Sequence, residues 1–539
     1  MPIADYEVVI GLEVHCQLDI QSKMFSACAY VPGAGGGSGE RAQIEANALT
    51  DPYTWGMPGT LPVPNRAAVD AALRLALALG CAVQPRSRWA RKHYFYPDLP
   101  KGYQITQAAR PYALGGEVEI EAVDGPREDK TWENETSEDE ARGPSTRRVP
   151  LERIHMEEDA GKNTHTDAQV SLVDYNRAGA ALVEIVSLPA LRSAAEAASY
   201  MRALRELVRC LGISDANMEE GTLRCDANVS LRPCRSPSQP DSPDYPLGTR
   251  CEIKNLNSFK FLEAAIEAEI RRQTDLLDRG ELVVQSTMSY DPVRDQTQVM
   301  RTKEAAADYR YFPEPDIPPL IIDAAWIADA SARLPELPWD RRRRLVGVFG
   351  LSAYDAGVLS AEVELARYFD ASMAALGECA GAPNQAQDQD QAQQAKLAKL
   401  ACNWITGELL KLLNSNRGDI AQCPVSPGAL AELITLVESG EISTRGGKQV
   451  LEKVYKQGLS PAEIVERDGL RQVSDTGAIA ALVAEVMDAN PDQLAQLLAG
   501  KAKVRGFFVG QIMRKSKGQA NPQLVQAAID AALAARGGG

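Results

Sequence analysis

A segment near the start of the chain alternates apolar and polar side chains, and this alternation restricts it to one kind of structure. Every even-numbered position from Val8 to Leu18 is apolar, whereas Glu13 and His15 occupy odd-numbered positions. An alternation of this length is typical of a β-strand with one buried face. Glu13 and His15 then lie on the other face, about 7 Å apart along the strand. Two such side chains can reach one cation, although a solvated outer face of an antiparallel sheet would explain this strand taken alone.

A similar alternation recurs between residues 222 and 232. The polar positions there include Arg224, Asp226 and Asn228, and every position between them is apolar. Most of this polar set are short side chains that donate or accept hydrogen bonds, unlike the long lysines and glutamates of a solvated face. The segment therefore predicts a second strand whose polar face contacts something other than water.

Two further segments place acids where a strand would bury them. Ala180–Val186 has the composition of a fully buried strand with Glu184 in its middle, and the strand-like segment 153–159 ends in Glu157, Glu158 and Asp159. An unpaired buried carboxylate costs several kcal/mol, so such groups are normally neutralised, paired with a base or bound to a metal. Carboxylates that gather also raise one another's pKa unless a cation lies among them.

The histidines support a metal site. There are only four in the chain, all in its first third, and His15 and His155 lie in segments rich in acids. Carboxylates with an imidazole suit Mg²⁺ or Mn²⁺, and oxygen-rich ligation argues against structural zinc. If these strands meet in space, they predict a divalent-metal site on a sheet.

Composition is that of an ordinary globular protein. The chain has 539 residues, which suggests about three or four domains, and 45% of them are hydrophobic. No stretch approaches 18 consecutive apolar residues, and the N-terminal segment is not expected to be a signal peptide. The ten scattered cysteines are expected to be reduced core thiols in the cytoplasm.

The net charge of −15 argues against general, non-specific binding of nucleic acid. One local exception stands out, because no acidic residue occurs from Leu494 to Ile529. A solvated helix face or a phosphate-binding surface would explain this run equally well. Its basic residues are Lys501, Lys503, Arg505, Arg514, Lys515 and Lys517.

The pattern along the chain changes from strands to helices after about Pro319. We expect three domains, at residues 1–320, 321–424 and 425–539. Within the second, the Gln/Ala/Asp-rich run 382–394 is expected to be a disordered loop. The last helix is signalled by Asn521 as its N-cap and Pro522 at its first position. Polar inserts at 124–148 and 233–246 are expected to be mobile surface loops.

Several common catalytic motifs are absent from the sequence. There is no G-x-x-x-x-G-K-[ST] loop, no G-x-S-x-G elbow and no serine-rich amidase signature. If ATP is used, a sheet and metal ions must bind it.

Eight long segments together resemble one family. The chain is similar to the B subunits of bacterial aspartyl/glutamyl-tRNA amidotransferases, the GatB family, nearly from end to end. The segments are V-I-G-L-E-V-H (9–15), R-K-H-Y-F-Y-P-D-L-P-K-G-Y-Q-I-T-Q (91–107), H-M-E-E-D-A-G-K (155–162), D-Y-N-R-A-G (174–179), M-E-E-G-T-L-R-C-D-A-N-V-S-L-R-P (218–233), E-I-K-N-L-N-S-F (252–259), D-Y-R-Y-F-P-E-P-D-I-P-P-L (308–320) and G-Q-I-M-R-K-S-K-G-Q-A-N-P (510–522).

The resemblance implies a fold and an activity. The fold would be α+β: a cradle like glutamine synthetase with an antiparallel sheet, a helical domain and an all-α tail like the YqeY proteins. With ATP and Mg²⁺, the protein would phosphorylate the side-chain carboxylate of Glu or Asp on a misacylated tRNA. Ammonia, released from glutamine by the amidase (A) subunit of a heterotrimer that also contains a small C subunit, would then displace the phosphate. No membrane partner is expected.

The resemblance also implies roles for individual residues. Glu13, His15, Glu157 and Glu184 match the catalytic metal site, and Lys92, Lys101 and Glu158 match residues along an ammonia path. Four polar side chains could contact a nucleotide or phosphate, and structural pairing between strands is a near-equal alternative for them. They are Arg224, Asp226, Asn228 and Lys254. The basic residues of the tail would contact tRNA. Three tyrosines, Tyr94, Tyr96 and Tyr103, could stack on the acceptor end of the tRNA. Aromatic clusters more commonly belong to the hydrophobic core, which is the alternative.

The chain departs from the family pattern at two places. Some members bind structural zinc through four cysteines near the N-terminus, but Cys28 is the one cysteine retained in the segment 24–28, so no zinc is expected. The acids that usually follow the metal-binding strand are replaced in the segment 187–190, which reads S-L-P-A. Any role for those acids is therefore in doubt, although the role of Glu184 is not.

Two other functions compete with this one. The first is a tRNA-binding scaffold that tethers the amidase without chemistry of its own, which would not need the four metal-site residues. The second is an ATP-dependent ligase that acts on a free amino acid, against which the basic tail speaks. The sequence leaves open whether Asp-tRNA, Glu-tRNA or both are substrates.

Overall fold

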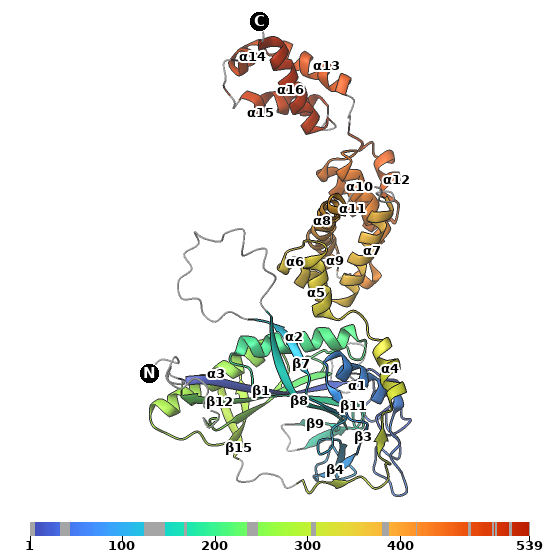
Figure 1. Cartoon of the computed structure of the whole chain (residues 1–539), viewed down its shortest axis with the longest axis vertical. Helices are drawn as coiled ribbons and strands as arrows, with labels where there is room; N and C mark the ends of the chain where they lie inside the picture. Colours follow the sequence, from blue (N-terminus) through green and yellow to red (C-terminus); the bar gives the residue numbers. More distant parts are fainter. Residues whose placement is uncertain are drawn as a thin grey trace. The chain divides into compact units, whose positions relative to one another are not determined.

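The structure is a computed structural model that describes residues 6–32, 44–122, 146–166, 170–233, 246–302, 309–379, 387–416, 418–472, 476–498, 501, 504–516 and 520–537. The chain forms two compact units, Met1–Arg341 and Arg342–Gly539. Each is described by itself (Figure 1).

The first unit is built on one large sheet. Its neighbouring strands follow the order β15-β14-β13-β12-β1-β11-β8-β5-β4-β16, with β6 and β7 also paired to β8 and β2 paired to β6. The strands of this unit are β1 (Tyr6–Gln17), β2 (Ala82–Val83), β3 (Arg86–Ser87), β4 (Ala90–His93), β5 (Tyr103–Thr106), β6 (Ala113–Leu114), β7 (Glu117–Glu121), β8 (Thr146–Glu158), β9 (Lys162–His165), β10 (Ser171–Asp174), β11 (Ala181–Ser187), β12 (Leu223–Pro233), β13 (Cys251–Leu256), β14 (Ser286–Asp291), β15 (Gln296–Thr302), β16 (Phe312–Pro313) and β17 (Leu320–Ile321).

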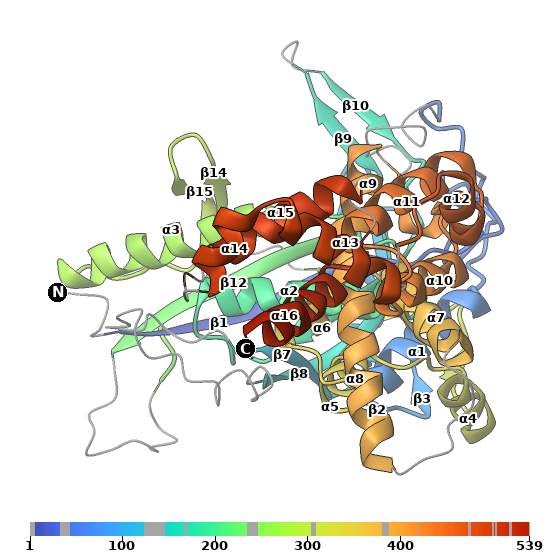
Figure 2. The ribbon, with the colours of Figure 1, turned by 90° about the horizontal axis from the view of Figure 1, so that it is seen from above.

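The pairing is antiparallel at nearly every step, as the sequence predicts. One described pair, β13 with β14, is parallel. The central neighbours β1 and β12 run side by side (Figure 2) and pair from Tyr6 opposite Pro233 to Cys16 opposite Leu223. The large sheet is therefore mixed, and its four adjacent central strands β12, β1, β11 and β8 are all antiparallel.

The apolar face of the sheet is covered by helices. The predicted alternation in β1 is confirmed, because Ile10, Leu12 and Val14 are fully buried in the main hydrophobic core. Helix α1 (Arg66–Ala78) packs on β2 and β8, α2 (Ala194–Cys210) on β7, and α3 (Phe259–Asp278) on β12 and β15. Each of these helices begins at a polar side chain that accepts hydrogen bonds from its first turn. The other face of the sheet is left for polar side chains.

The first unit continues past the predicted boundary at residue 320. Helix α4 (Ala324–Ala332) packs against α1, and Trp326 Nε1 donates a hydrogen bond to Asp70 Oδ1 over 3.0 Å. Arg333 donates to the two Asp70 oxygens as well. Helix α5 (Pro338–Gly347) follows, and the compact unit ends within it at Arg341. The three domain boundaries stay predictions, but α4 packs with the sheet unit.

The second unit is helical and contains two hydrophobic clusters. One cluster joins helices from α5 to α12, and the other joins α13 to α16. A cut between residues 424 and 425 would divide the first cluster, because α10 packs closely on α7. The helices are α6 (Ala353–Ser360), α7 (Val363–Cys379), α8 (Gln387–Asn403), a π-helical turn (Trp404–Leu409), α9 (Leu410–Ser415), α10 (Pro427–Glu438), α11 (Thr444–Gln457), α12 (Pro461–Arg467), α13 (Thr476–Asp488), α14 (Pro491–Leu498), α15 (Arg505–Lys515) and α16 (Pro522–Gly537).

Two local predictions in the second unit have opposite outcomes. The last helix is confirmed, since the side chain of Asn521 accepts hydrogen bonds from the backbone N–H groups of Gln523 and Leu524. The expected disordered loop at 382–394 is wrong from residue 387 onward, where α8 begins. Ala and Gln favour helix, and this part of the run contains neither Gly nor Pro. Residues 382–386 lie outside the described residues.

Other expectations are tested only in part. The insert expected at 124–148 lies outside the described residues except for 146–148, which begin β8, and the insert at 233–246 is described only at its ends. Six of the described cysteines are buried free thiols, as predicted: Cys16, Cys81, Cys210, Cys225, Cys251 and Cys402. No helix in the described ranges is both long and apolar enough to cross a bilayer.

The turn between β6 and β7 provides a test of this fold. Gly115 and Gly116 both have positive φ, at 64° and 88°. A Cβ on Gly116 would lie 2.5 Å from Cys81 Sγ and 2.7 Å from the Leu79 carbonyl oxygen, whereas a Cβ on Gly115 would meet nothing within 4 Å. Gly115→Ala should cost about 1–2 kcal/mol of backbone strain, and Gly116→Ala should cost a further 1–3 kcal/mol or so from overpacking. Urea-unfolding midpoints of the two variants measure the difference, and equal midpoints would contradict the described packing.

Candidate functional site

The polar face of the central strands carries a row of functional side chains. Antiparallel register places Arg224 of β12 opposite His15 of β1, His15 opposite Glu184 of β11, and Glu184 opposite His155 of β8. Residues separated by up to 209 positions in the chain (Arg224 − His15 = 209) thus become neighbours across four strands. The acid-bearing strands therefore meet on one face of the sheet, which the sequence left open.

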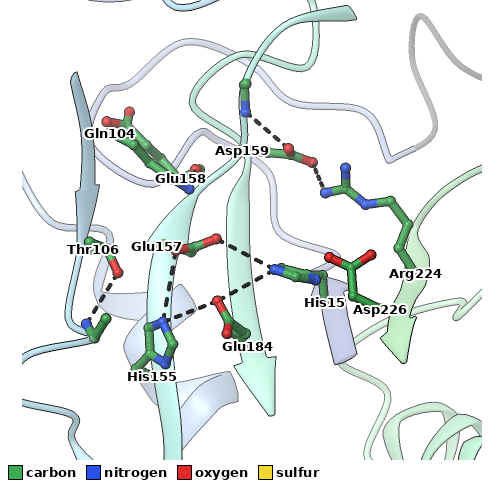
Figure 3. A network of polar contacts seen from close by, with 12 residues as sticks. His15, Gln104, Thr106, His155, Glu157, Glu158, Asp159, Glu184, Arg224 and Asp226 are labelled. Atoms are coloured by element: carbon green, nitrogen blue, oxygen red, sulfur yellow. Dashed lines mark hydrogen bonds and ion pairs between the residues drawn. The ribbon is translucent and has the colours of Figure 1, made fainter. Parts of the chain in front are cut away.

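Three of the four predicted metal-site residues form one cluster. Ligand atoms of His15, Glu157 and Glu184 all lie within 4.8 Å of one another. His15 Nε2 is 3.4 Å from Glu184 Oε2 and 4.0 Å from Glu157 Oε1 (Figure 3). Both carboxylates are buried. Two buried carboxylates beside an imidazole form a ligand set that suits a hard divalent cation.

Glu13, the fourth predicted ligand, lies two residues before His15 on β1. Its backbone is opposite Asp226 of β12, and its Oε1 accepts a hydrogen bond of 3.0 Å from Asn228 Nδ2. It faces the same cavity but does not belong to the tight cluster in the described part of the chain. Its role as a ligand stays a prediction.

The charges of the cluster are strongly coupled. Burial raises the pKa of Glu13, and the nearby Glu184 carboxylate raises it further. Burial also raises the pKa of Glu184, but the imidazoles of His155 and His15 outweigh this and hold it well below the usual range. Burial lowers the pKa of His15, whereas its contacts with Glu184 and Glu157 raise it overall. The Glu184 carboxylate is thus ionised at neutral pH, which is the form that can bind a cation.

The cluster forms one wall of a cavity of about 450 Å³. The cavity extends over the sheet from β4 and β8 to β15 and past the segment that precedes β16. Its lining holds acids, bases and two tyrosines: Glu13, His15, Lys92, Thr106, Ala108, Arg153, His155, Glu157, Glu184, Asp226, Glu252, Lys254, Thr287, Arg301, Tyr309 and Tyr311.

The predicted nucleotide or phosphate contacts are paired with other side chains. Arg224 Nη2 donates to Asp159 Oδ2 over 2.6 Å. Lys254 Nζ lies 2.7 Å from Asp226 Oδ2 and 2.8 Å from Glu252 Oε1. Since Asn228 donates to Glu13, all four have partners on the sheet, as the structural alternative expects. Of the four, Asp226 and Lys254 line the cavity, and their contact with a phosphate stays a prediction.

The three residues predicted along an ammonia path lie in two places. Lys101 Nζ donates to both Glu158 oxygens, over 2.5 and 2.6 Å, in a buried pair that Tyr53 covers. Burial lowers the pKa of Lys101 although Glu158 opposes the shift. Lys92 instead lines the cavity, where burial lowers its pKa but Glu157 and other neighbours raise it overall. Glu158 points away from the Glu157 cluster (Figure 3).

The three aromatic residues differ in their surroundings, and Tyr103 packs against the main hydrophobic core. Tyr96 is 51% exposed, and Tyr94 and Tyr103 are half-buried. Tyr94 contacts Tyr309 edge to face, and the Arg91 guanidinium lies over the Tyr103 ring. The core alternative is therefore wrong for Tyr96, while stacking on a nucleotide stays a prediction.

Several lining residues were missed by the sequence analysis. Arg153 precedes Glu157 on the same face of β8, so the period-two pattern could have revealed it. His155 supported the metal site in the sequence but was given no role of its own. Glu252 lies two positions before Lys254 on β13 in the same way. Arg301 lies near the end of β15, and Tyr309 and Tyr311 come from the segment before β16; no local pattern indicates that these residues reach this cavity.

The basic run of the tail is only partly described. Lys503 and Lys517 lie outside the described residues, and Lys501 is exposed. Arg505 Nη2 is 2.5 Å from Asp530 Oδ2, and Lys515 pairs with Glu485. These acids lie outside the acid-free window, so the local positive charge is smaller than the sequence suggests. Arg514 is in the last turn of α15.

Comparison with known proteins adds two family matches. A model of the GatB/GatE catalytic domain matches residues 8–328, and a model of the GatB domain matches residues 389–533. The first match spans the sheet with its polar face, and the second lies within the helical unit.

Individual relatives are similar over nearly the whole chain. All are described as the B subunit of an aspartyl/glutamyl-tRNA(Asn/Gln) amidotransferase. That of Anaeromyxobacter sp. (strain K) is 48% identical over 531 residues, which cover 98% of this chain and 99% of the relative. The relative from Geobacter sulfurreducens is 46% identical over 525 residues, and that from Myxococcus xanthus is 45% identical over 526 residues; each alignment covers 97% of this chain and 98% of the relative.

Proposed function

The chain belongs to the GatB family, and on this premise we propose that it converts the side-chain carboxylate of misacylated Glu-tRNA(Gln) or Asp-tRNA(Asn) to an amide, using ATP. The reaction is that of a ligase which forms a carbon–nitrogen bond with glutamine as the nitrogen donor. The observation that carries the proposal is the convergence of His15, Glu157 and Glu184 on one wall of a charged cavity.

The cluster fits a magnesium ion by its chemistry. Glu157 and Glu184 lie buried side by side, and a hard cation would balance their negative charge in place of protons on the neighbouring imidazoles. Bound there, Mg²⁺ would screen the negative charges of ATP and of the substrate carboxylate, which otherwise repel each other. Glu13, in the neighbouring row, is proposed as a further ligand.

The cavity can receive two anionic reactants. Five acids line it (Glu13, Glu157, Glu184, Asp226 and Glu252), and four bases face them (Lys92, Arg153, Lys254 and Arg301). We infer that Arg153, Lys254 and Arg301 hold the phosphates and the attacking carboxylate in place, whereas Lys92 is proposed to lie where the ammonia path meets the cavity. Alignment of the two reactants is the main contribution a protein makes to phosphoryl transfer.

The remaining parts of the proposal concern partners. The amidase, which is the A subunit, would supply ammonia, and the small C subunit would complete a heterotrimer. Lys101 and Glu158 are proposed to lie on the ammonia path, where a buried base and acid could take a proton from ammonium. The tail is proposed to be like YqeY proteins and to bind tRNA, and the sheet unit to be a cradle like glutamine synthetase. We place the complex in the cytoplasm, where reduced thiols persist.

The metal site gives the first test of this function. Glu184→Gln keeps the volume of the side chain but removes the charge, so ATP-dependent phosphorylation of the charged tRNA should fall by about a thousand-fold, a loss of several kcal/mol of charge stabilisation. Glu269→Gln is a matched control, because Glu269 is equally buried on α3 but contacts Arg272, Gln273 and Thr297 away from the cavity.

Single-turnover assays of the complete complex with ³²P-ATP measure this step. The control should keep wild-type activity at the assay temperature. Unchanged phosphorylation by Glu184→Gln would contradict the assignment of the metal site. It would favour the alternative of a scaffold that binds tRNA but catalyses no reaction.

The ammonia path gives a second test. Glu158→Gln or Lys92→Met should lower glutamine-dependent amidation by at least about tenfold, since proton transfer at a fixed acid or base typically contributes more than this. Glutamine hydrolysis by the amidase should continue, and added ammonium should restore amidation if it enters by another route. Parallel assays of glutamate release and of amidated tRNA measure the two activities.

A double variant separates transport from stability. Glu158→Gln strands the buried ammonium of Lys101, which is itself costly. Lys101→Met combined with Glu158→Gln removes both charges. If the double variant recovers glutamine-dependent amidation, the pair is structural and the path lies elsewhere.

The tail gives a third test, for which the two hydrophobic clusters suggest the cut. A chain that ends at Gln472 keeps the first cluster of the helical unit whole and removes α13 to α16. It should raise the Michaelis constant for tRNA by roughly tenfold and flatten its salt dependence, because phosphate contacts release counterions. The rate at saturating tRNA should change less. Filter binding of tRNA over a salt series measures both effects. If the truncated and intact complexes had equal affinity and equal salt dependence, the basic run would be only a solvated face.

A further inference from the structure

One buried side chain of the site has no role in the proposed chemistry. His155 projects from β8 onto the polar face of the sheet, beside Glu184. Its side chain is 1% exposed, so water does not satisfy it. Among the residues that the structure describes, neither of its ring nitrogens has a hydrogen-bond partner of adequate geometry. A buried imidazole in this condition is costly, which suggests that the site requires it.

His155 faces the two carboxylates of the metal cluster. Its Nε2 lies 3.3 Å from Glu184 Oε2 and 3.8 Å from Glu157 Oε2. His15 approaches the same two side chains; it meets the other oxygen of Glu157, Oε1, but the same oxygen of Glu184, Oε2. The two carboxylates therefore lie between two imidazoles (Figure 3).

The two histidines are not equivalent. His15 is 20% exposed and belongs to the set of ligand atoms that lie within 4.8 Å of one another. His155 is outside that set and fully buried. An imidazole this close to a ligating carboxylate can turn to donate its N–H to one oxygen. At Glu157 this would fix Oε2 and leave Oε1, on the side of His15, to bind a metal.

We propose that His155 is a positioning residue that orients the carboxylates of Glu157 and Glu184 for a divalent cation, without binding the cation or the substrate itself. The proposal rests on the proposed metal role of the cluster. It divides the labour between the histidines: His15 contributes a ligand atom, and His155 sets the geometry of the two acids.

Binding of Mn²⁺ to the full heterotrimeric complex, followed by electron paramagnetic resonance without ATP or tRNA, tests the proposal. His155→Leu keeps most of the volume but cannot donate, so the Kd should rise about 10- to 100-fold. His155→Gln places an amide nitrogen near the position of Nε2 and should restore most of the affinity. His155→Asn is too short to reach and should behave like His155→Leu.

Activity assays give a second readout. The magnesium concentration for half-maximal activity should rise in His155→Leu, while kcat at saturating magnesium recovers toward wild type. A lower kcat with unchanged metal affinity would mean that His155 acts on the substrate, and would overturn the proposal. If His155→Leu does not fold, the comparison of His155→Gln with His155→Asn tests the proposal instead. Equal Kd values of these two variants for Mn²⁺ would overturn the proposal.

Two controls separate the possible failures. Ile154→Val alters the fully buried residue next to His155, on the face of β8 that packs in the hydrophobic core, and should leave the Kd for Mn²⁺ unchanged. An increase equal to that of His155→Leu would show general loosening of the strand and contradict positioning. Glu184→Gln should abolish binding. If it binds Mn²⁺ like wild type, the metal role itself fails, whereas loss in Glu184→Gln without an effect in His155→Leu refutes only the role of His155.

Discussion

The structure of the site depends on one buried negative charge. Glu184 lies in β11, whose residues are all buried, and its carboxylate is held ionised by imidazoles on both neighbouring strands. A charge in such a place is stable only if its surroundings are fixed, because a small displacement would leave it unpaired. The helices on the apolar face provide this rigidity, since they pack the alternate side chains of the same strands. The hydrophobic core and the polar site are thus two faces of one set of strands.

Much of this arrangement could be predicted from single strands. The alternation in residues 8–18 predicted which side chains share a face. The acid inside 180–186 was predicted to be neutralised, paired with a base or bound to a metal. What a single strand does not contain is register. Nothing local says that His15 lies opposite Glu184, or that Lys254 reaches Asp226 from the next strand. Register depends on pairing between segments far apart in the chain, so the membership of the cluster and the partners of Arg224 became known only from the structure.

Two properties inferred from single segments depend on neighbouring segments. The run 387–394 looks disordered because it is polar and repetitive, yet its residues favour a helix that the adjoining apolar segment anchors. The positive charge of the tail is reduced by Glu485 and Asp530, acids outside the stretch that looked purely basic. In each case the property of one segment depends on another part of the chain, adjoining it in α8 and paired with it in the tail.

The antiparallel register of the four central strands also limits how a chain of this kind can change in length. One residue inserted within β1, β8, β11 or β12 would turn every following side chain of that strand to the opposite face, exchanging ligands for core residues. The connections between strands carry no such restriction. Apart from residues 146–148 in β8 and Pro233 in β12, the two polar inserts accordingly fall between β7 and β8 and between β12 and β13 in the sequence. Related chains should therefore vary in length at these connections and keep the spacing of His155 to Glu157 and of Glu13 to His15 unchanged.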